Sequence, residues 1–252
     1  MLAALYILGS LVAAWLGGLA LVPAGELQLP AVWFPAGMLF GIAVVDRTSR
    51  LPLWAAVSFI AMILSVTLRG VPVSLAIVLG AVVTATVCGG ALAVRRRLHD
   101  RFNLGHFTDA LTLIVGILGA AVAAAVLSVA VVGLSGARAV FLADAIGMLL
   151  AGPLVAGLIT ERRWWRDTLR SWRLLEVVIV FAGALLITDA VFGERVEPFL
   201  RVPAFILPFM LWPAFRFGPS GSALVIAVIC TDAFQNLSSM RSEEHTSELQ
   251  SH

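Results

Sequence analysis

Long apolar segments follow one another along almost the whole chain, and they limit what it can fold into. Hydrophobic residues make up 60% of the 252 residues, whereas charged residues make up only 13%. Soluble domains carry about 25% charged residues, so this chain has too few polar side chains to cover a surface exposed to water. The composition therefore predicts an integral membrane protein.

The length of the apolar segments predicts the fold class. A bilayer core about 30 Å thick requires roughly 20 helical residues. The segments that meet this requirement are Leu2–Val22, Leu27–Val45, Leu51–Leu68, Val71–Val94, Ala110–Leu134, Phe141–Ile159, Leu174–Phe192 and Val202–Phe217. A ninth segment begins near Ser220 and stays apolar through Cys230 before it meets Asp232. We expect an all-α, polytopic transmembrane helix bundle with about eight complete spans and a truncated ninth.

The distribution of arginine sets the expected orientation. The chain contains no lysine, and its loops after even-numbered spans hold twelve arginines against four in the loops after odd-numbered spans. Cytoplasmic loops carry the excess of positive charge. We therefore expect a multi-pass protein of the bacterial inner (plasma) membrane whose N-terminus is cytoplasmic.

The segment Glu161–Arg173 combines five arginines with Trp164, Trp165 and Trp172. Basic and aromatic side chains together can bind nucleic acid. Tryptophan beside a membrane span, however, normally lies at the headgroup level, where arginine meets anionic lipid. We expect the lipid bilayer to be the partner of this segment and expect no nucleic acid.

The sequence contains no recognised catalytic motif. HExxH, GxSxG and CxxC are absent, and a chain without lysine has no Walker A motif. Cys88 and Cys230 each lie inside an apolar segment and are interpreted as small buried residues, so neither a disulfide nor a metal site is predicted. We expect no enzymatic activity, no cofactor and no metal.

Ionisable side chains inside spans are costly in hydrocarbon, and they point to function. Asp144 lies near the start of a span among apolar residues, and two interpretations stay open: a helix-entry residue, or a polar contact in an outward-facing cavity. Glu176 and Arg216 are interpreted as helix ends at the cytoplasmic headgroups, and Asp189 as a residue that reaches the outer interface. Asp232 lies in the truncated ninth span.

Proline and small residues add two expectations about packing. The element Trp33-Phe34-Pro35-Ala36-Gly37 interrupts the second span, and further prolines punctuate the eighth. Proline kinks helices, so such a segment can line a pocket, act as a hinge or serve only packing. Gly116, Ala120 and Ala124 stand four residues apart, a spacing that lets helices approach closely.

Three elements occur in a characteristic order: the Trp33–Gly37 element, the span Phe141–Pro153 and the turn Leu211–Gly221. They resemble, in that order, the W-P-x-A-G element, the D-A-x-G-x-L-x-x-x-P span and the W-x-x-x-R-F-G-x-x-G turn of the MASE1 family of bacterial membrane-associated sensor domains. The similarity covers roughly residues 5 to 235. The chain departs from the pattern at Phe34, where a second proline is frequent.

The resemblance implies a non-catalytic sensor that precedes a cytoplasmic output domain, either a diguanylate cyclase or phosphodiesterase of cyclic-di-GMP turnover or a histidine kinase. A homodimer and an unidentified small-molecule ligand would follow from that role. The candidate ligand or sensing residues are Trp33, Pro35, Gly37, Asp144 and Pro153, and the candidate transmission residues are Trp212, Arg216 and Gly218. The alternatives are a small-solute transporter or permease, because broken helices and a carboxylate also occur there, and a membrane scaffold. An inverted repeat, which would favour transport, is not visible.

The last twelve residues, 241–252 (RSEEHTSELQSH), resemble the translation of a common short-read sequencing adapter, without a gap through Ser251. A polar linker that leaves the membrane is the alternative, since disordered tails have similar compositions. We expect residues 1–240 to be the sensor domain, incomplete at its C-terminus. Residues 241–252 are then an adapter-derived tail, and the output domain is missing.

Overall fold

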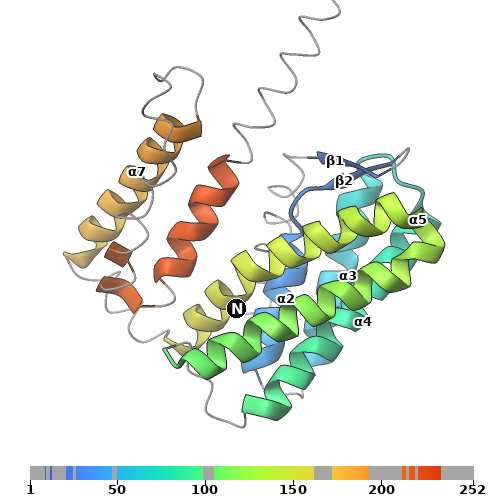
Figure 1. Cartoon of the computed structure of the whole chain (residues 1–252), viewed down its shortest axis with the longest axis horizontal. Coiled ribbons are helices and arrows are strands. Elements are labelled where there is room, and N and C mark those ends of the chain that lie inside the picture. The colour runs from blue at the N-terminus through green and yellow to red at the C-terminus, as the bar shows by residue number, and fades with distance from the viewer. Residues whose placement is uncertain are drawn as a thin grey trace, which may run out of the picture. The chain divides into compact units, whose positions relative to one another are not determined.

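The computed structural model describes residues 9, 12, 21–24, 27–46, 50–98, 105–161, 172–192, 212–213, 216–218 and 221–233. The chain divides into two compact units, Met1–Thr160 and Glu161–His252. The first unit contains β1 (Leu21–Ala24), β2 (Leu27–Pro30), α2 (Phe34–Val45), α3 (Leu51–Thr67), α4 (Val73–Leu98) and α5 (Phe107–Thr160) (Figure 1). The second unit contains α7 (Arg173–Phe192) and the helix Gly221–Ala233.

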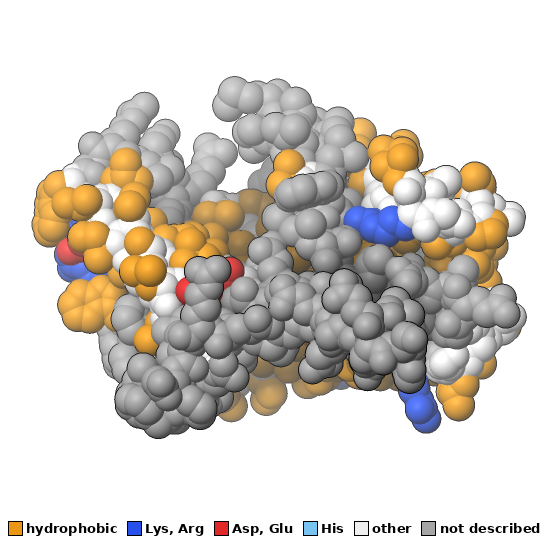
Figure 2. All heavy atoms as spheres, turned by 90° about the horizontal axis from the view of Figure 1, so that it is seen from above, with side chains coloured by type: hydrophobic (Ala, Val, Ile, Leu, Met, Phe, Trp, Pro, Cys, Tyr) orange, Lys and Arg blue, Asp and Glu red, His pale blue; other side chains and the backbone are white. Residues whose placement is uncertain are grey.

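Helix is the dominant structure, which confirms the predicted helical fold class. Within the described residues, α4 and α5 are long and apolar enough to cross a membrane, whereas α2, α3 and the helix Gly221–Ala233 are shorter apolar helices. Figure 2 shows a face on which hydrophobic side chains predominate among the described residues and charged ones are few. A surface of this kind is suited to lipid and not to water.

The prediction that Leu27–Val45 forms one helix is wrong for its first part. The strands β1 and β2 pair as an antiparallel hairpin, with Leu21 opposite Pro30 and Ala24 opposite Leu27. Two residues connect the strands, which is the commonest hairpin length. Proline disrupts a helix interior because it lacks an N–H group and its ring clashes with the preceding turn.

The element Trp33–Gly37 is also not a bend within a helix, because α2 begins at Phe34. Trp33 is the N-cap residue, and Pro35 lies in the first turn of α2. Proline is favoured there because the first N–H groups of a helix have no partner within the helix. Pro35 therefore lies at the start of a helix instead of interrupting one.

The helix α5 reverses direction at Gly133. A straight helix of its 54 residues would be about 80 Å long, far more than a bilayer is thick. Gly133 adopts φ 69° and ψ −176°, a conformation that glycine reaches without steric cost. The arms 107–132 and 134–160 consequently run antiparallel (Figure 1). The structure thus has helices where the sequence predicts the fifth and sixth spans, with a turn in place of the expected loop.

Small residues bring α4 and the first arm of α5 into close contact, as their spacing predicts. A Cβ atom added to Gly116 would overlap the Cγ2 atom of Val94, and one added to Gly90 would lie 2.8 Å from the Cβ of Ala120. Ala120 and Ala124 are both buried. The two helices are therefore antiparallel neighbours whose distance is set by glycine and alanine.

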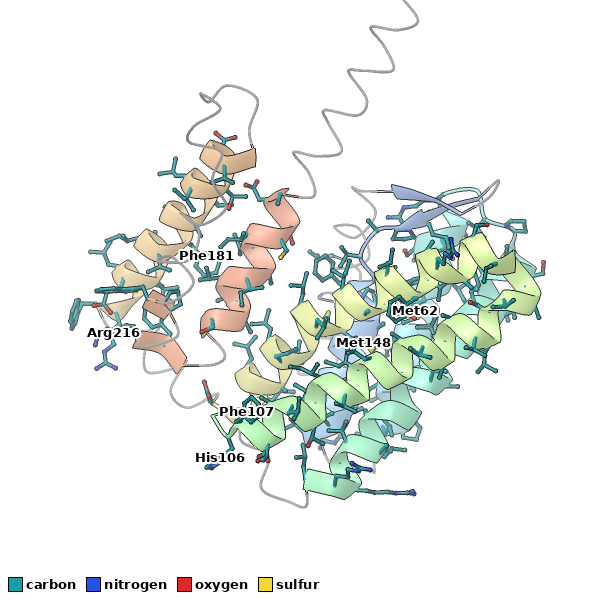
Figure 3. All side chains as sticks on the ribbon, viewed as in Figure 1. Met62, His106, Phe107, Met148, Phe181 and Arg216 are labelled. Carbon is teal, nitrogen blue, oxygen red and sulfur yellow. The ribbon has the colours of Figure 1, made fainter. Side chains whose placement is uncertain are left out.

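The core of the first unit lies where α2 meets α4 and α5. The largest fully buried side chains there include those of Trp33, Phe40, Leu79, Ile117 and Met148. Figure 3 shows Met148 on the second arm of α5 within this unit. The second unit has a small apolar core of its own, formed by Ala184, Val191, Val225 and Ile229 between α7 and the helix Gly221–Ala233.

Two glycines three residues apart test the packing of α5. Gly116→Ala should destabilise the protein by about 1–3 kcal/mol, because the added methyl group overlaps Val94. Gly119→Ala should be neutral or stabilising by up to about 1 kcal/mol, because nothing lies within 4 Å of its added Cβ and alanine favours helix. Thermal unfolding in detergent micelles, followed by circular dichroism, measures both. Equal effects of the two substitutions would contradict the close contact.

Candidate functional site

Asp144 is a fully buried carboxyl group well inside the second arm of α5. This position does not support its interpretation as a helix-entry residue. Among the residues that the structure describes, neither carboxyl oxygen has a hydrogen-bond partner. Two other buried side chains, by contrast, are satisfied by their own helices: Ser128 Oγ donates to the carbonyl of Ala125 at 2.8 Å, and Thr188 Oγ1 to that of Ala184 at 2.7 Å. Asp144 is therefore an exception that requires an explanation.

Trp33 lies next to the helix segment that carries this carboxyl group. Its backbone N–H donates to the carbonyl of Ala143 at 2.9 Å, which ties the start of α2 to the residue before Asp144. The indole is buried, and its Nε1–H also has no partner in the described part of the chain. An acceptor and a donor without partners thus come from two segments that are bonded to each other. Their chemistry is complementary, because a carboxylate only accepts hydrogen bonds and an indole N–H only donates.

Glycines hold α2 and the second arm of α5 backbone to backbone. A Cβ atom on Gly147 would overlap the carbonyl of Trp33, one on Gly37 would overlap the carbonyl of Gly147, and one on Gly41 would overlap the carbonyl of Gly152. The contacts advance along both helices in the same direction, so the helices are parallel. The Trp33–Gly37 element and the aspartate-to-proline span therefore form one contact.

The two candidate prolines have different places in this contact. Pro35 is buried in the first turn of α2, next to Trp33. Pro153 lies inside the second arm of α5, half-buried, directly after Gly152. A proline inside a helix leaves a carbonyl of the preceding turn without its helical partner. The structure thus brings Trp33, Pro35, Gly37 and Asp144 to one end of the contact and places Pro153 farther along it.

The opposite end of α2 carries polar contacts that the sequence analysis missed. Trp54 Nε1 donates to the Asp46 carboxylate at 2.8 Å, and Arg95 Nη1 donates to the carbonyl of Asp46. Arg95 is thus more than a charge that ends a span.

Arg69, which follows α3, also has a polar contact that was not predicted. It donates to Ser65 Oγ at 2.8 Å, and partial burial lowers the pKa of its guanidinium below the usual value. A charged side chain next to the end of a helix was the only sequence signal for these contacts.

In the second unit, Arg216 and Glu176 form a two-pronged ion pair. Arg216 Nε and Nη2 donate to Glu176 Oε2 and Oε1, both at 3.0 Å. The side chains are 41% and 22% exposed, so water or headgroups reach the pair. Figure 3 shows Arg216 at one end of α7. The two residues are interpreted from the sequence as marking separate helix ends. The pairing of residues 40 positions apart was not predicted.

The residues around Arg216 explain the late glycine-rich turn. Phe217 is buried, and Gly218 adopts φ 69°, a left-handed conformation that favours glycine. A Cβ atom on Gly221 would overlap the Phe217 Cβ. Trp212 is 60% exposed, as expected for an aromatic side chain at the membrane–water boundary. The element thus combines an ion pair, a buried aromatic ring and a tight turn.

Asp189 and Asp232 lie close enough in the second unit to interact electrostatically. Asp189 is exposed, and its interpretation as a residue that reaches the outer interface stays a prediction. Other predictions fall outside the described residues: most of the first and eighth spans, Trp164 and Trp165, and the tail 241–252.

The helices with lipid-compatible surfaces define a membrane-embedded helical domain, and its described polar site is a buried carboxyl group at a glycine-mediated helix contact. The MASE1 family model matches residues 1–251, which include all three elements. The chain belongs to the MASE1 family, a family of membrane-associated sensor domains. Neither a curated protein nor a solved structure matches the chain.

The substitution Asp144→Asn tests whether the carboxyl group contributes to stability. We expect an unchanged or higher melting temperature, because the substitution keeps the size of the side chain and removes a charge that would cost several kcal/mol when buried alone. The comparison variant Gly147→Ala should lower the melting temperature by several degrees, since its methyl group overlaps the backbone of Trp33. Thermal unfolding in detergent measures both. A marked loss of stability in Asp144→Asn would indicate that the carboxylate has a stabilising partner.

Charge reversal tests the ion pair of the second unit. Glu176→Arg and Arg216→Glu should each lower the melting temperature, because each places two like charges within about 3 Å of one another. The double variant should return it toward the wild-type value, since the pair is restored with opposite polarity. A double-mutant cycle of melting temperatures isolates the interaction. Additive losses in the double variant would show that the two residues act separately.

Proposed function

We propose that this chain is a non-catalytic integral membrane sensory module that passes a signal to a cytoplasmic output domain. The output domain would be a cyclic-di-GMP cyclase or phosphodiesterase or a histidine kinase. Family membership supports the sensory role. The observation that carries the proposal is the contact between Trp33 and the Asp144 segment, because it places two buried polar groups without described partners at a contact between helices.

We propose a bacterial inner-membrane topology with a cytoplasmic N-terminus, about eight complete spans and an incomplete ninth. The arginine distribution supports this orientation. The parallel course of α2 and the second arm of α5 fits the order of the spans, because the second and sixth spans must run in the same direction under either orientation. Under this topology Trp33 and Asp144 lie toward the outer side, and Asp46 and Arg95 lie at the cytoplasmic end.

The sensing step that we propose is a choice between two packings of α2 against α5. Burying Asp144 and the Trp33 indole without partners costs free energy, so a solute that supplies hydrogen bonds to both would favour a packing that admits it. A ligand shifts such an equilibrium only through its different affinities for the two states. Because tightly packed surfaces do not deform continuously, the backbone contacts at Gly37 and Gly147 would make the change from one packing to the other a discrete step.

The candidate transmission residues lie in the second unit. The Arg216–Glu176 pair links the turn at Gly218 to α7 and would move these elements together. Trp212 would anchor this region at the membrane surface. Paired output domains would make the signalling form a homodimer, and the sensed ligand would be a small molecule.

The first experiment is to read the source gene past codon 240 and then to test Asp144→Asn in the complete protein. We expect a cyclase, phosphodiesterase or kinase domain, whose activity in wild-type cells changes with growth conditions. Asp144→Asn should leave the amount of protein in the membrane unchanged and abolish that change. The conserved-size variant Ser128→Ala, on the first arm of α5, is the control and should respond like the wild type.

Two results would contradict the proposal. A reading frame without any signalling domain would favour a transporter, which uptake assays on the complete protein would then test. A normal response in Asp144→Asn would remove Asp144 from the sensing site even if a signalling domain is present. The two results are separable, because the first concerns the class of protein and the second only the site.

A further inference from the structure

A groove of about 610 Å³ runs between α4 and the first arm of α5. Its lining is almost entirely small or aliphatic and includes Gly89, Ala93, Val115, Gly119 and Ala123, with an arginine at one end. These residues are exposed, so the groove opens on the outer surface of the two helices. α4 and α5 are the described helices that are long enough to cross a membrane. The groove therefore faces the place that lipid would occupy.

The shape of the groove follows from its glycines. Nothing lies within 4 Å of a Cβ atom added to Gly89 or to Gly119, so each position is open space and not a packing contact. The helices themselves touch on the neighbouring face, at Gly90 and Gly116. The groove is thus a preformed hollow beside a tight contact. Its volume lies within the usual range of about 300–1,000 Å³ for sites that hold one small ligand.

The groove has one charged lining residue, which lies at one end. The hydroxyl of Thr86 donates to the carbonyl of Val82 at 2.9 Å, and that of Thr112 to the carbonyl of Thr108 at 2.7 Å, so both hydroxyl donors are used within their own helices. Arg97, in the last turn of α4, lines the groove and is exposed. A guanidinium group carries five N–H donors and binds phosphate oxygens in a bidentate manner.

We propose that this groove binds one anionic phospholipid, with an acyl chain along the glycine and alanine lining and the phosphate at Arg97. An apolar channel with a cation at one end matches an amphiphile that has one hydrocarbon chain and an anionic headgroup. The proposed topology places Arg97 at the cytoplasmic leaflet, where anionic lipids attract basic side chains. The site is separate from the contact of Trp33 and Asp144, so it does not depend on the proposed sensing step, and only the choice of leaflet rests on the proposed topology.

Lipid retention tests the site directly. The protein is purified in micelles that contain phosphatidylglycerol or phosphatidylcholine at equal mole fraction, and native mass spectrometry counts the bound lipid. The wild type should retain phosphatidylglycerol in preference to phosphatidylcholine. Arg97→Gln should weaken that retention about tenfold, the effect of losing a charged hydrogen bond. Arg96→Gln should not, because Arg96 is exposed but does not line the groove.

Substitutions that fill the groove provide a second, independent test of the lipid site. Gly89→Leu combined with Gly119→Leu should abolish retention of phosphatidylglycerol, because leucine side chains would occupy the space of the acyl chain. The control places the same leucine side chains at Ala81 and Ala130, which are exposed on the same helices outside the groove, as Ala81→Leu and Ala130→Leu. These controls should bind lipid like the wild type. Melting temperatures verify that each variant folds. If the filled variants do not fold, the result for Arg97→Gln alone decides whether the groove binds the lipid.

Three outcomes would overturn the proposal. Equal losses in Arg97→Gln and Arg96→Gln would show attraction to general surface charge. Unchanged retention in the filled variant would place the lipid elsewhere. A changed oligomeric state in the filled variant, with unchanged lipid retention, would assign the groove to a second copy of the chain. Because lipid is counted directly, a failure of the sensory proposal would leave all of these results interpretable.

Discussion

The backbone contact between α2 and the second arm of α5 is the constraint on which the rest of the first unit depends. At Gly37, Gly41 and Gly147 a single added carbon would overlap a carbonyl of the opposite helix. Helices in lipid gain little from the hydrophobic effect and associate through close packing, so glycine at the contact supplies much of the attraction. The contact fixes where Trp33 lies, and the Trp33 backbone in turn bonds to Ala143, next to Asp144. The buried carboxyl group is therefore placed by glycines and not by a polar partner of its own.

Much of the fold could be predicted from the sequence, because hydrophobic length is a strong signal in membrane proteins. The ranges of α3, α4, α7 and both arms of α5 agree with predicted spans to within several residues. The start of α2 could not be predicted by that rule, since apolar residues occur equally in a β-hairpin and in a helix. Pro35 carried the information, because proline suits the first turn of a helix.

The residues of the candidate site could be named from the sequence, but the contacts between them could not. Trp33 and Asp144 were chosen from separate motifs, and nothing in the spacing of two distant segments shows that they touch. Glu176 and Arg216 were both noticed as charges near helix ends, yet their pairing depends on tertiary structure. Asp46 was not singled out at all, because a carboxylate that follows a span is ordinary in sequence and becomes distinctive only when Trp54 and Arg95 bind it.

The same local arrangement occurs in both units, with different consequences. In each, a glycine lies directly against a buried aromatic residue: Gly147 against Trp33, and Gly221 against Phe217. Each of these contacts lies beside an ionisable residue, but Arg216 is partly exposed and paired with Glu176, whereas Asp144 is fully buried and has no described partner. A paired charge near water changes little in energy between conformations. The energy of a buried carboxyl group changes greatly when a partner or water reaches it. For this reason the proposed sensing role is assigned to Asp144 and not to the paired, partly exposed Arg216.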